Sequence, residues 1–196
     1  MNAFLTGVIF LVAFTATGNC IECIHCYSAD GPDCSGEAKS CAEGVTTCQT
    51  LTVLLKEDGV DTHKVVKFCG TGEEANSIYW EASLTTSYQL ETHSCQTDKC
   101  NEEPPQFTPS DNTPNGVKCL HCLEDHSTEC NTEEIIECTG DLNQCLFITG
   151  SVCHDGADYY TCAHRLCTNV ANAEQHPFYL DKYIHKLEIT DGINLE

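Results

Sequence analysis

The sequence predicts an all-β, disulfide-rich fold made of two tandem modules. The cysteines carry this prediction: 17 occur in 196 residues, and sixteen of them fall in two blocks of eight. The blocks open with nearly the same spacing, C-x2-C-x7-C-x6-C-x6-C and C-x2-C-x7-C-x7-C-x6-C, which indicates a duplicated module. The members are Cys23, Cys26, Cys34, Cys41, Cys48, Cys69, Cys95 and Cys100, then Cys119, Cys122, Cys130, Cys138, Cys145, Cys153, Cys162 and Cys167.

Residues 1–20 are predicted to be a secretory signal peptide. The apolar run of residues 4–14 is too short to span a bilayer and lies where the hydrophobic region of a signal peptide is expected. Cleavage after Cys20 would leave two balanced blocks, whereas cleavage after Gly18 would keep Cys20 on the mature chain. We therefore expect a secreted, extracellular protein with disulfides, rather than a cytosolic one with reduced thiols.

Module one is predicted to span residues 21–103 and to contain a β-hairpin. Residues 50–55 and 63–68 are rich in strand formers, and residues 56–59 supply turn chemistry between them. A module of this length builds only a marginal core. Disulfides, at roughly 3 kcal/mol for a 15-residue loop, are expected to supply the missing stability.

Residues 104–115 are predicted to be a proline-rich, extended linker. Module two then spans residues 116–196 and repeats the hairpin, with strands over residues 146–149 and 158–161 around a turn at residues 154–156. A cysteine-free tail follows Cys167, and its Lys182 and Lys186 are expected to be open to proteases. Residues 178–187 are a weak candidate for a helix.

The composition excludes two classes of partner. The net charge is −21, from 30 acidic and 9 basic residues, which disfavours nucleic acid and anionic membrane surfaces. We expect an extracellular, basic protein as partner; the alternative is that the charge only keeps a secreted protein dispersed. The C-terminal residues lack the apolar tail of a lipid-anchor signal, so no membrane anchor is expected.

No residue pattern in the chain indicates catalysis. The two C-x2-C pairs could hold zinc, but an even cysteine count per block behind a signal peptide favours disulfides. The Cys153-His154-Asp155 run reads as a turn, and no nucleophile elbow, zinc-protease motif or phosphate loop occurs. We therefore predict a non-enzymatic protein with no cofactor and no metal.

The cysteine pattern and one terminal motif resemble a known superfamily. Cys23-x2-Cys26 and the run Cys95-Gln96-Thr97-Asp98-Lys99-Cys100-Asn101 are similar to the two signatures of the lymphocyte-antigen/urokinase-receptor superfamily, whose fold is the three-finger domain of snake neurotoxins. The resemblance implies two tandem three-finger domains, with Asn101 tying the end of the first to its core. The opening of module two, residues 115–119, is similar to gamma-type phospholipase A2 inhibitors and to sodefrin precursor-like factors, the amphibian courtship pheromones.

The resemblance also implies a disulfide pairing. Module one lacks the third-finger disulfide of the family, since Ser94 precedes Cys95, and module two lacks the terminal Cys-Asn motif. The last pair below requires a folded-back finger, because a straight hairpin holds its two cysteines apart. The pairs that the resemblance implies are Cys23–Cys48, Cys26–Cys34, Cys41–Cys69, Cys95–Cys100, Cys119–Cys145, Cys122–Cys130 and Cys138–Cys162. Cys153 and Cys167 remain, and Cys153–Cys167 is the eighth pair.

The function implied is that of a secreted ligand that binds another protein. A pheromone acting on an extracellular receptor ranks first, and an inhibitor of secreted phospholipase A2 is the alternative. Finger tips are the expected binding surface, because loops on a rigid base carry recognition. The candidate residues are Lys56, Glu57 and Asp58 in the second finger, and Tyr79 and Trp80 in the third. Trp80 could instead pack against the neighbouring finger.

Overall fold

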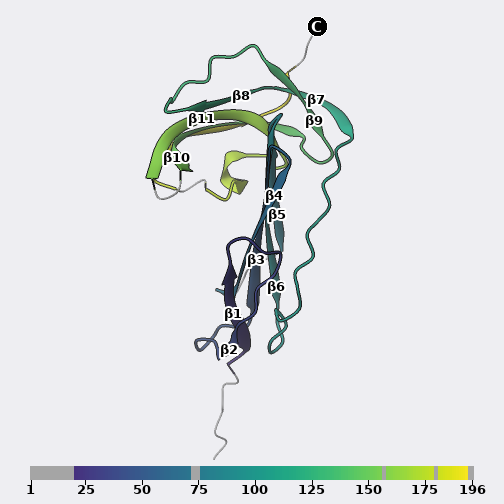
Figure 1. The fold of residues 1–196 in the computed structure, drawn as a ribbon, viewed down its shortest axis with the longest axis vertical. Coiled ribbons are helices and arrows are strands. Elements are labelled where there is room, and N and C mark those ends of the chain that lie inside the picture. Colours follow the sequence, from purple (N-terminus) through teal and green to yellow (C-terminus); the bar gives the residue numbers. More distant parts are fainter. Residues whose placement is uncertain (1–19, 72–75, 156–157, 179–180, 194–196) are drawn as a thin grey trace, which may run out of the picture.

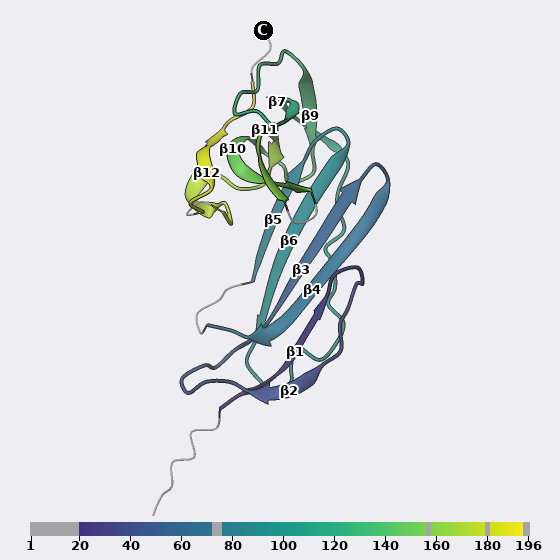
Figure 2. The ribbon, with the colours of Figure 1, turned by 60° about the vertical axis from the view of Figure 1, so that its left-hand side comes forward.

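The computed structural model describes residues 20–71, 76–155, 158–178 and 181–193 (Figures 1 and 2). The apolar run of the predicted signal peptide lies outside these residues. Apart from a single turn of 3-10 helix, the regular elements are strands, as predicted. Their bounds are β1 Glu22–Ser28, β2 Glu37–Ser40, β3 Cys48–Glu57, β4 Val60–Cys69, β5 Ser77–Ala82, β6 Thr86–Cys95, β7 Pro114–Leu120, β8 Cys122–Asp125, β9 Ile135–Thr139, β10 Gln144–Asp155, β11 Asp158–Thr168, η1 Ala173–Gln175 and β12 Ile184–Thr190.

Domain 1 is an antiparallel sheet of three fingers in the order β5-β6-β3-β4-β1-β2. The second finger is the hairpin β3–β4, which carries the two runs of strand formers found in the sequence. Its two-residue turn is Asp58-Gly59, where both φ angles are positive, 49° and 80°. Asp-Gly is a favoured pair for such a turn, because it tolerates the left-handed conformation. The strands run side by side along the length of the domain (Figure 2).

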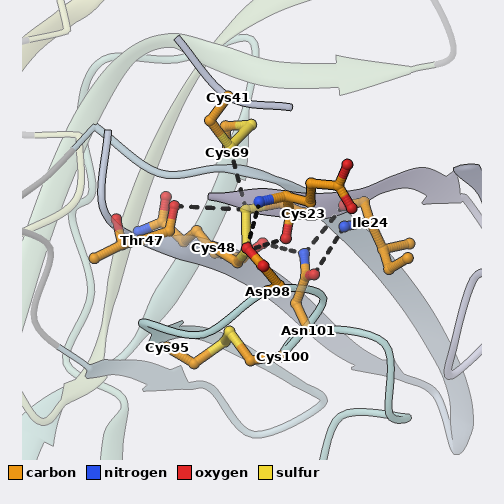
Figure 3. The surroundings of a disulfide bond; sticks show 12 residues. Cys23, Ile24, Cys41, Thr47, Cys48, Cys69, Cys95, Asp98, Cys100 and Asn101 are labelled. Atoms are coloured by element: carbon orange, nitrogen blue, oxygen red, sulfur yellow. Dashed lines mark hydrogen bonds between the residues drawn. A yellow bond between two sulfur atoms is a disulfide. The ribbon is translucent and has the colours of Figure 1, made fainter. Parts of the chain in front are cut away.

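The base of domain 1 is built from disulfides and from Asn101 (Figure 3). The Asn101 side chain accepts a hydrogen bond from the Ile24 backbone N–H at 2.9 Å and donates to the Ile24 carbonyl at 3.0 Å. It therefore extends β1 as a further strand would. Beside it, the Lys99 N–H donates to the Glu22 carbonyl, and Asp98 accepts from the Glu22 N–H. These contacts fasten the end of domain 1 to its first strand.

Six of the pairs that the resemblance implied are present in the structure. Their Cα–Cα separations lie between 5.3 and 6.2 Å, within the range that a disulfide requires. In domain 1 they form much of the core, with Cys23 and Cys48 fully buried. The six are Cys23–Cys48, Cys26–Cys34, Cys41–Cys69, Cys95–Cys100, Cys119–Cys145 and Cys122–Cys130.

The other two pairs differ from those implied. The structure joins Cys138 to Cys167 and Cys153 to Cys162, in place of Cys138–Cys162 and Cys153–Cys167. The reason is the length of the β10–β11 hairpin, which continues to Thr168 and places Cys167 opposite Cys145. Cys167 thus occupies the position that Cys69 has opposite Cys48 in domain 1. Cys153 and Cys162 lie nearer the turn and cross-link the hairpin itself, with no folded-back finger.

Among the described residues of domain 2, a single strand, β12, stands in place of a third finger. β7 and β9 pair as the first finger, and β8 lies along β11. β12 pairs with β10 as β6 pairs with β3, so it takes the place of β6. The tail is therefore not the free peptide that the sequence suggested. Its Ile184, Leu187 and Ile189 pack against the core, and the described part of residues 178–187 contains no helix.

The proline-rich linker is fastened along domain 1 rather than free (Figure 1). The buried Lys67 amine lies 3.1 Å from the carbonyl oxygens of both Glu102 and Glu103, the last two residues before the linker. Farther along, the buried Glu91 carboxylate accepts hydrogen bonds from the Thr108 N–H and hydroxyl. Contacts of this kind fix the path of the chain between the two domains.

Candidate binding groove between the two domains

The predicted binding residues of the second finger lie at its tip. Glu57 and Asp58 are exposed, and the Lys56 amine lies 4.0 Å from an Asp61 carboxylate oxygen. The Asp58 N–H donates to the carbonyl of Thr85, which holds this tip against the turn of the third finger. The three residues are therefore accessible to a partner, in the position that the sequence suggested.

Tyr79 and Trp80 are not at a finger tip, contrary to the prediction from the sequence. Their position instead locates the interface between the two domains. They lie on β5 and are buried, with 5 % and 7 % of their surface exposed. Trp80 does not pack on a neighbouring finger either: it packs into the cysteine base of domain 2 beside Cys119, Cys138 and Cys167. Domain 2 covers the third finger of domain 1, so the sequence, read module by module, could not show this burial.

The two domains share one sheet through β5 and β11. Thr168 pairs with Glu81 and Cys167 with Ala82, and the result is a ten-stranded sheet that crosses from one domain to the other. Figure 1 shows domain 2 lying across the upper ends of the domain 1 strands. A backbone connection of this kind sets the orientation of the domains, because every strand-to-strand hydrogen bond is directional.

Asn169, which follows β11, connects the two domains at this junction through three hydrogen bonds to β5. Its Oδ1 accepts from the Trp80 N–H at 2.8 Å, its Nδ2 donates to the Ile78 carbonyl at 2.9 Å, and its own N–H donates to the Trp80 carbonyl at 3.0 Å. Asn101 makes the same kind of contact with β1. Sequence reasoning missed Asn169, although Cys167-Thr168-Asn169 has an asparagine two residues after a cysteine.

A chain of three hydrogen bonds crosses the interface next to Asn169. The Phe178 N–H donates to Nδ1 of His176 at 3.2 Å, so the neutral ring carries its proton on Nε2. His176 Nε2 lies 2.8 Å from the Tyr79 hydroxyl and donates to it, and that hydroxyl in turn donates to Oε2 of Glu81. Oε1 of Glu81 has no donor among the described residues.

Burial shifts the pKa of each member of this chain. It raises the pKa of the Glu81 carboxyl to about 7, although the Tyr79 hydrogen bond acts in the opposite direction. Burial and the Glu81 charge raise the pKa of the Tyr79 hydroxyl well above its ordinary value, and they raise that of Tyr88 to about 12. Burial lowers the pKa of His176 to about 4. Near neutral pH, Glu81 is therefore the member of the chain that titrates.

Glu81 lies in a groove between the two domains. Two adjoining cavities of about 400 and 460 Å³ make up this groove, and both are lined by Glu81, Tyr88 and Lys64 of domain 1. Aromatic side chains of domain 2 form the opposite wall, and Phe178 and Tyr183 are 41 % and 51 % exposed. The domain 2 residues of the wall are Leu123, Asp125, Ser151, Cys153, Tyr159, Tyr160, His164, Leu166, Phe178, Asp181 and Tyr183.

Negative charge prevails in the groove and beside it. Among the described lining residues, four are carboxylates and one, Lys64, is a lysine. Next to the groove, no lysine or arginine occurs between Lys118 and Arg165. This acidic stretch includes seven exposed carboxylates: Glu124, Asp125, Glu129, Glu133, Glu134, Glu137 and Asp141. The electrostatic field around the groove therefore attracts cations.

The cysteines that could suggest a zinc site are engaged in disulfides. Three groups bring candidate ligand atoms within 4.8 Å of one another, and each contains disulfide-bonded cysteines. A disulfide sulfur is not the thiolate that zinc requires. The one free cysteine in the described part of the chain is Cys20, which is exposed. The groove itself offers carboxylates and aromatic rings as contact groups.

Comparisons with known proteins agree with this architecture. Residues 19–103 and 115–189 each match the u-PAR/Ly-6 domain. The chain is 36 % identical over 148 residues to a gamma-type phospholipase A2 inhibitor from Elaphe quadrivirgata, covering 74 % of this chain and 73 % of the inhibitor.

Two further relatives are similar to this chain in sequence. The chain is 34 % identical over 140 residues to phospholipase A2 inhibitor NAI of Notechis ater, covering 70 % of this chain and 69 % of that one. It is 30 % identical over 141 residues to the urokinase plasminogen activator surface receptor of Rattus norvegicus, covering 68 % of this chain and 41 % of the receptor. With two matched domains, eight disulfides and a three-finger architecture, the chain belongs to the u-PAR/Ly-6 family.

Proposed function

We propose that the protein acts outside the cell as an inhibitor that binds a secreted phospholipase A2. The observation that carries this proposal is the similarity to proteins named as inhibitors of this enzyme, together with the length of the alignments. An alignment of 148 residues is longer than either matched domain alone, so the similarity extends over both. An inhibitor that uses both domains would be expected to preserve their arrangement as well as their folds.

The inhibitor replaces the pheromone as the leading interpretation. From the sequence alone, a courtship pheromone ranks ahead of a phospholipase inhibitor. The named relatives reverse that order, since two of those described above are inhibitors of phospholipase A2. The surface supports an inhibitor too, because an acidic groove and acidic first finger of domain 2 suit a basic enzyme.

Binding alone would account for inhibition. The described residues place no nucleophile beside a base, and the conspicuous features are a groove and charged finger tips. No helix in the described part of the chain is long and apolar enough to cross a bilayer. A three-finger protein of this kind would inhibit by covering a surface that the phospholipase needs, such as the one that meets its lipid substrate.

The test is an inhibition and binding assay with a basic secreted phospholipase A2. Hydrolysis of phosphatidylcholine vesicles is expected to fall in proportion to the added protein until one equivalent is reached. The association rate should fall as salt rises, because exposed charges are screened over about 8 Å at physiological ionic strength. An acidic phospholipase A2 serves as control. Undiminished hydrolysis by both enzymes, with no complex in a pull-down, would refute the proposal.

A further inference from the structure

The groove between the two domains combines features that are seldom found together on a free surface. Its floor carries a half-buried carboxylate, Glu81, with one oxygen turned away from the Tyr79 hydrogen bond. Tyr88, Phe178 and Tyr183 lie around the same cavity. Aromatic rings and a carboxylate in one concave site are what a cation on an aliphatic stem prefers, because the rings attract the charge and cover the stem.

The geometry points to a specific occupant. We propose, on the basis of the function proposed above, that the groove takes up a lysine or arginine side chain that projects from the surface of the phospholipase. The Glu81 carboxylate is its counter-ion, and Tyr88, Phe178 and Tyr183 enclose its stem. The free oxygen of Glu81 accepts a hydrogen bond from the incoming ammonium or guanidinium group.

The charges around the groove favour this occupant over an anion or a neutral chain. Glu57, Asp125 and Asp181 line the same cavities as Glu81, against one lysine, Lys64. Lys64 makes no ion pair among the described residues, so it leaves the Glu81 carboxylate without a cationic partner. A bound cation would supply that partner through a charge-assisted hydrogen bond, which is stronger than one between neutral groups.

Binding of this side chain should be coupled to the loss of the proton from Glu81. Burial raises the pKa of Glu81 to about 7, and a cation next to it would lower this pKa again. Binding should therefore release a proton, and affinity should rise with pH between about 5.5 and 8. The other titratable or charged groups around Glu81 are Tyr79 on β5, Tyr88 on β6, Glu57 on β3, Lys64 on β4, and Asp125, Tyr159, Tyr160, His164, His176, Asp181 and Tyr183 of domain 2.

The test compares Glu81→Gln with Glu37→Gln, which removes the same charge from the exposed strand β2. Affinity for a basic secreted phospholipase A2 is expected to fall about tenfold or more in E81Q, as for other desolvated charge pairs, and less than twofold in E37Q. E81Q should also lose the rise of affinity with pH. Equal losses in the two variants would overturn the groove as the site, while leaving the proposed inhibitor in place.

A second probe separates failure of the groove from failure of the proposed function. A pentapeptide with a central arginine and the same peptide with citrulline are titrated into the full mature protein at physiological salt, with detection by NMR. The arginine peptide should shift resonances of Tyr88 and Tyr183, and the citrulline peptide should not. If the phospholipase fails to bind at all, this selectivity still supports the groove. If both peptides behave alike, the cation site is wrong.

Discussion

Glu81 shows how a single buried residue can make an interface sensitive to pH. Its carboxylate ends a chain of hydrogen bonds that begins on His176 of the other domain, and the Tyr79 hydroxyl carries the link between them. Protonation of His176 would remove the hydrogen bond that its Nδ1 accepts from Phe178. Ionisation of Glu81 places a negative charge in the groove between the two domains. Low pH therefore changes this hydrogen-bond chain at His176, and high pH changes it at Glu81.

Replacing Glu81 with glutamine should make the protein more stable at alkaline pH. The native state keeps the Glu81 proton up to about pH 7, whereas a carboxyl with the ordinary value of 4.5 releases it earlier. The native state thus binds more protons between these values, and its free energy of unfolding falls as pH rises through them. E81Q lacks this loss, so its advantage over wild type should grow from pH 5 to pH 8, by about 2–3 kcal/mol.

Urea unfolding at pH 5, 6.5 and 8 measures this difference. E37Q, which neutralises an exposed carboxylate on β2, is the matched control and should show little change with pH. A difference between E81Q and wild type that is the same at all three pH values would contradict the prediction, because it would mean that Glu81 titrates as an exposed carboxyl does.

Among the elements, the hairpins could be predicted from the sequence, but the end of one strand could not. Strand formers and turn residues locate β3, β4 and the start of β10 correctly. β11 continues through His164 and Arg165, which break the pattern of strand formers, because it pairs there with β8 and then with β5. The cysteine spacing does indicate that Cys167 is the counterpart of Cys69, because Cys48 and Cys69 are 21 residues apart and Cys145 and Cys167 are 22 apart.

Contacts between segments that are distant in the sequence could not be predicted either, because each depends on a partner that the local residue pattern does not show. Three apolar residues of the tail, Ile184, Leu187 and Ile189, become part of β12 because β10 offers an open strand edge. The linker is held by Glu91 and Lys67, two charged residues that composition alone would place on the surface. Their burial is possible because each has several partners: Lys67 forms an ion pair with Asp33 and donates to the carbonyls of Glu102 and Glu103, and Glu91 accepts from the Thr108 N–H.

Trypsin should distinguish the two lysines of the tail. Lys182 lies in an exposed turn, whereas Lys186 lies on β12 with its backbone paired to Thr149 of β10. Proteases need an extended, unpaired segment, so cleavage after Lys182 should precede cleavage after Lys186 in the native protein. Mass analysis of a time course measures the order. Early release of the segment that begins at Leu187 would show that β12 does not stay paired to the sheet.

In the whole molecule, the junction of β5 and β11 determines whether the two domains keep a fixed orientation or move independently. Trp80 is the only tryptophan in the sequence and is buried at this junction. Asn169 supplies two side-chain hydrogen bonds to the strand that carries it. The linker limits the separation of the domains, but the contacts of β5 with the base of domain 2 set their angle. Tryptophan fluorescence therefore reports directly on docking.

Asn169→Ala should loosen this junction without unfolding either domain. The loss of two side-chain hydrogen bonds at a half-buried site should cost about 1–2 kcal/mol, and Trp80 emission should shift to longer wavelength as the domains part. Asn131→Ala removes an exposed asparagine whose side chain bonds only to Glu129 among the described residues, and it should change neither property. Unaltered Trp80 emission and quenching in N169A would mean that the apolar contacts alone hold the domains together.

The single strand in the third position of domain 2 affects whether further modules could be added to the array in the same way. The modules join head to tail, with the third finger of one against the cysteine base of the next, and an arrangement of this kind could in principle continue without limit. It needs a β5 on each module, and β12 has no such neighbour in the described chain. Within the described residues, domain 2 therefore lacks the strand edge through which domain 1 receives its neighbour. A third module, or a second molecule, would have to contact domain 2 through a different surface.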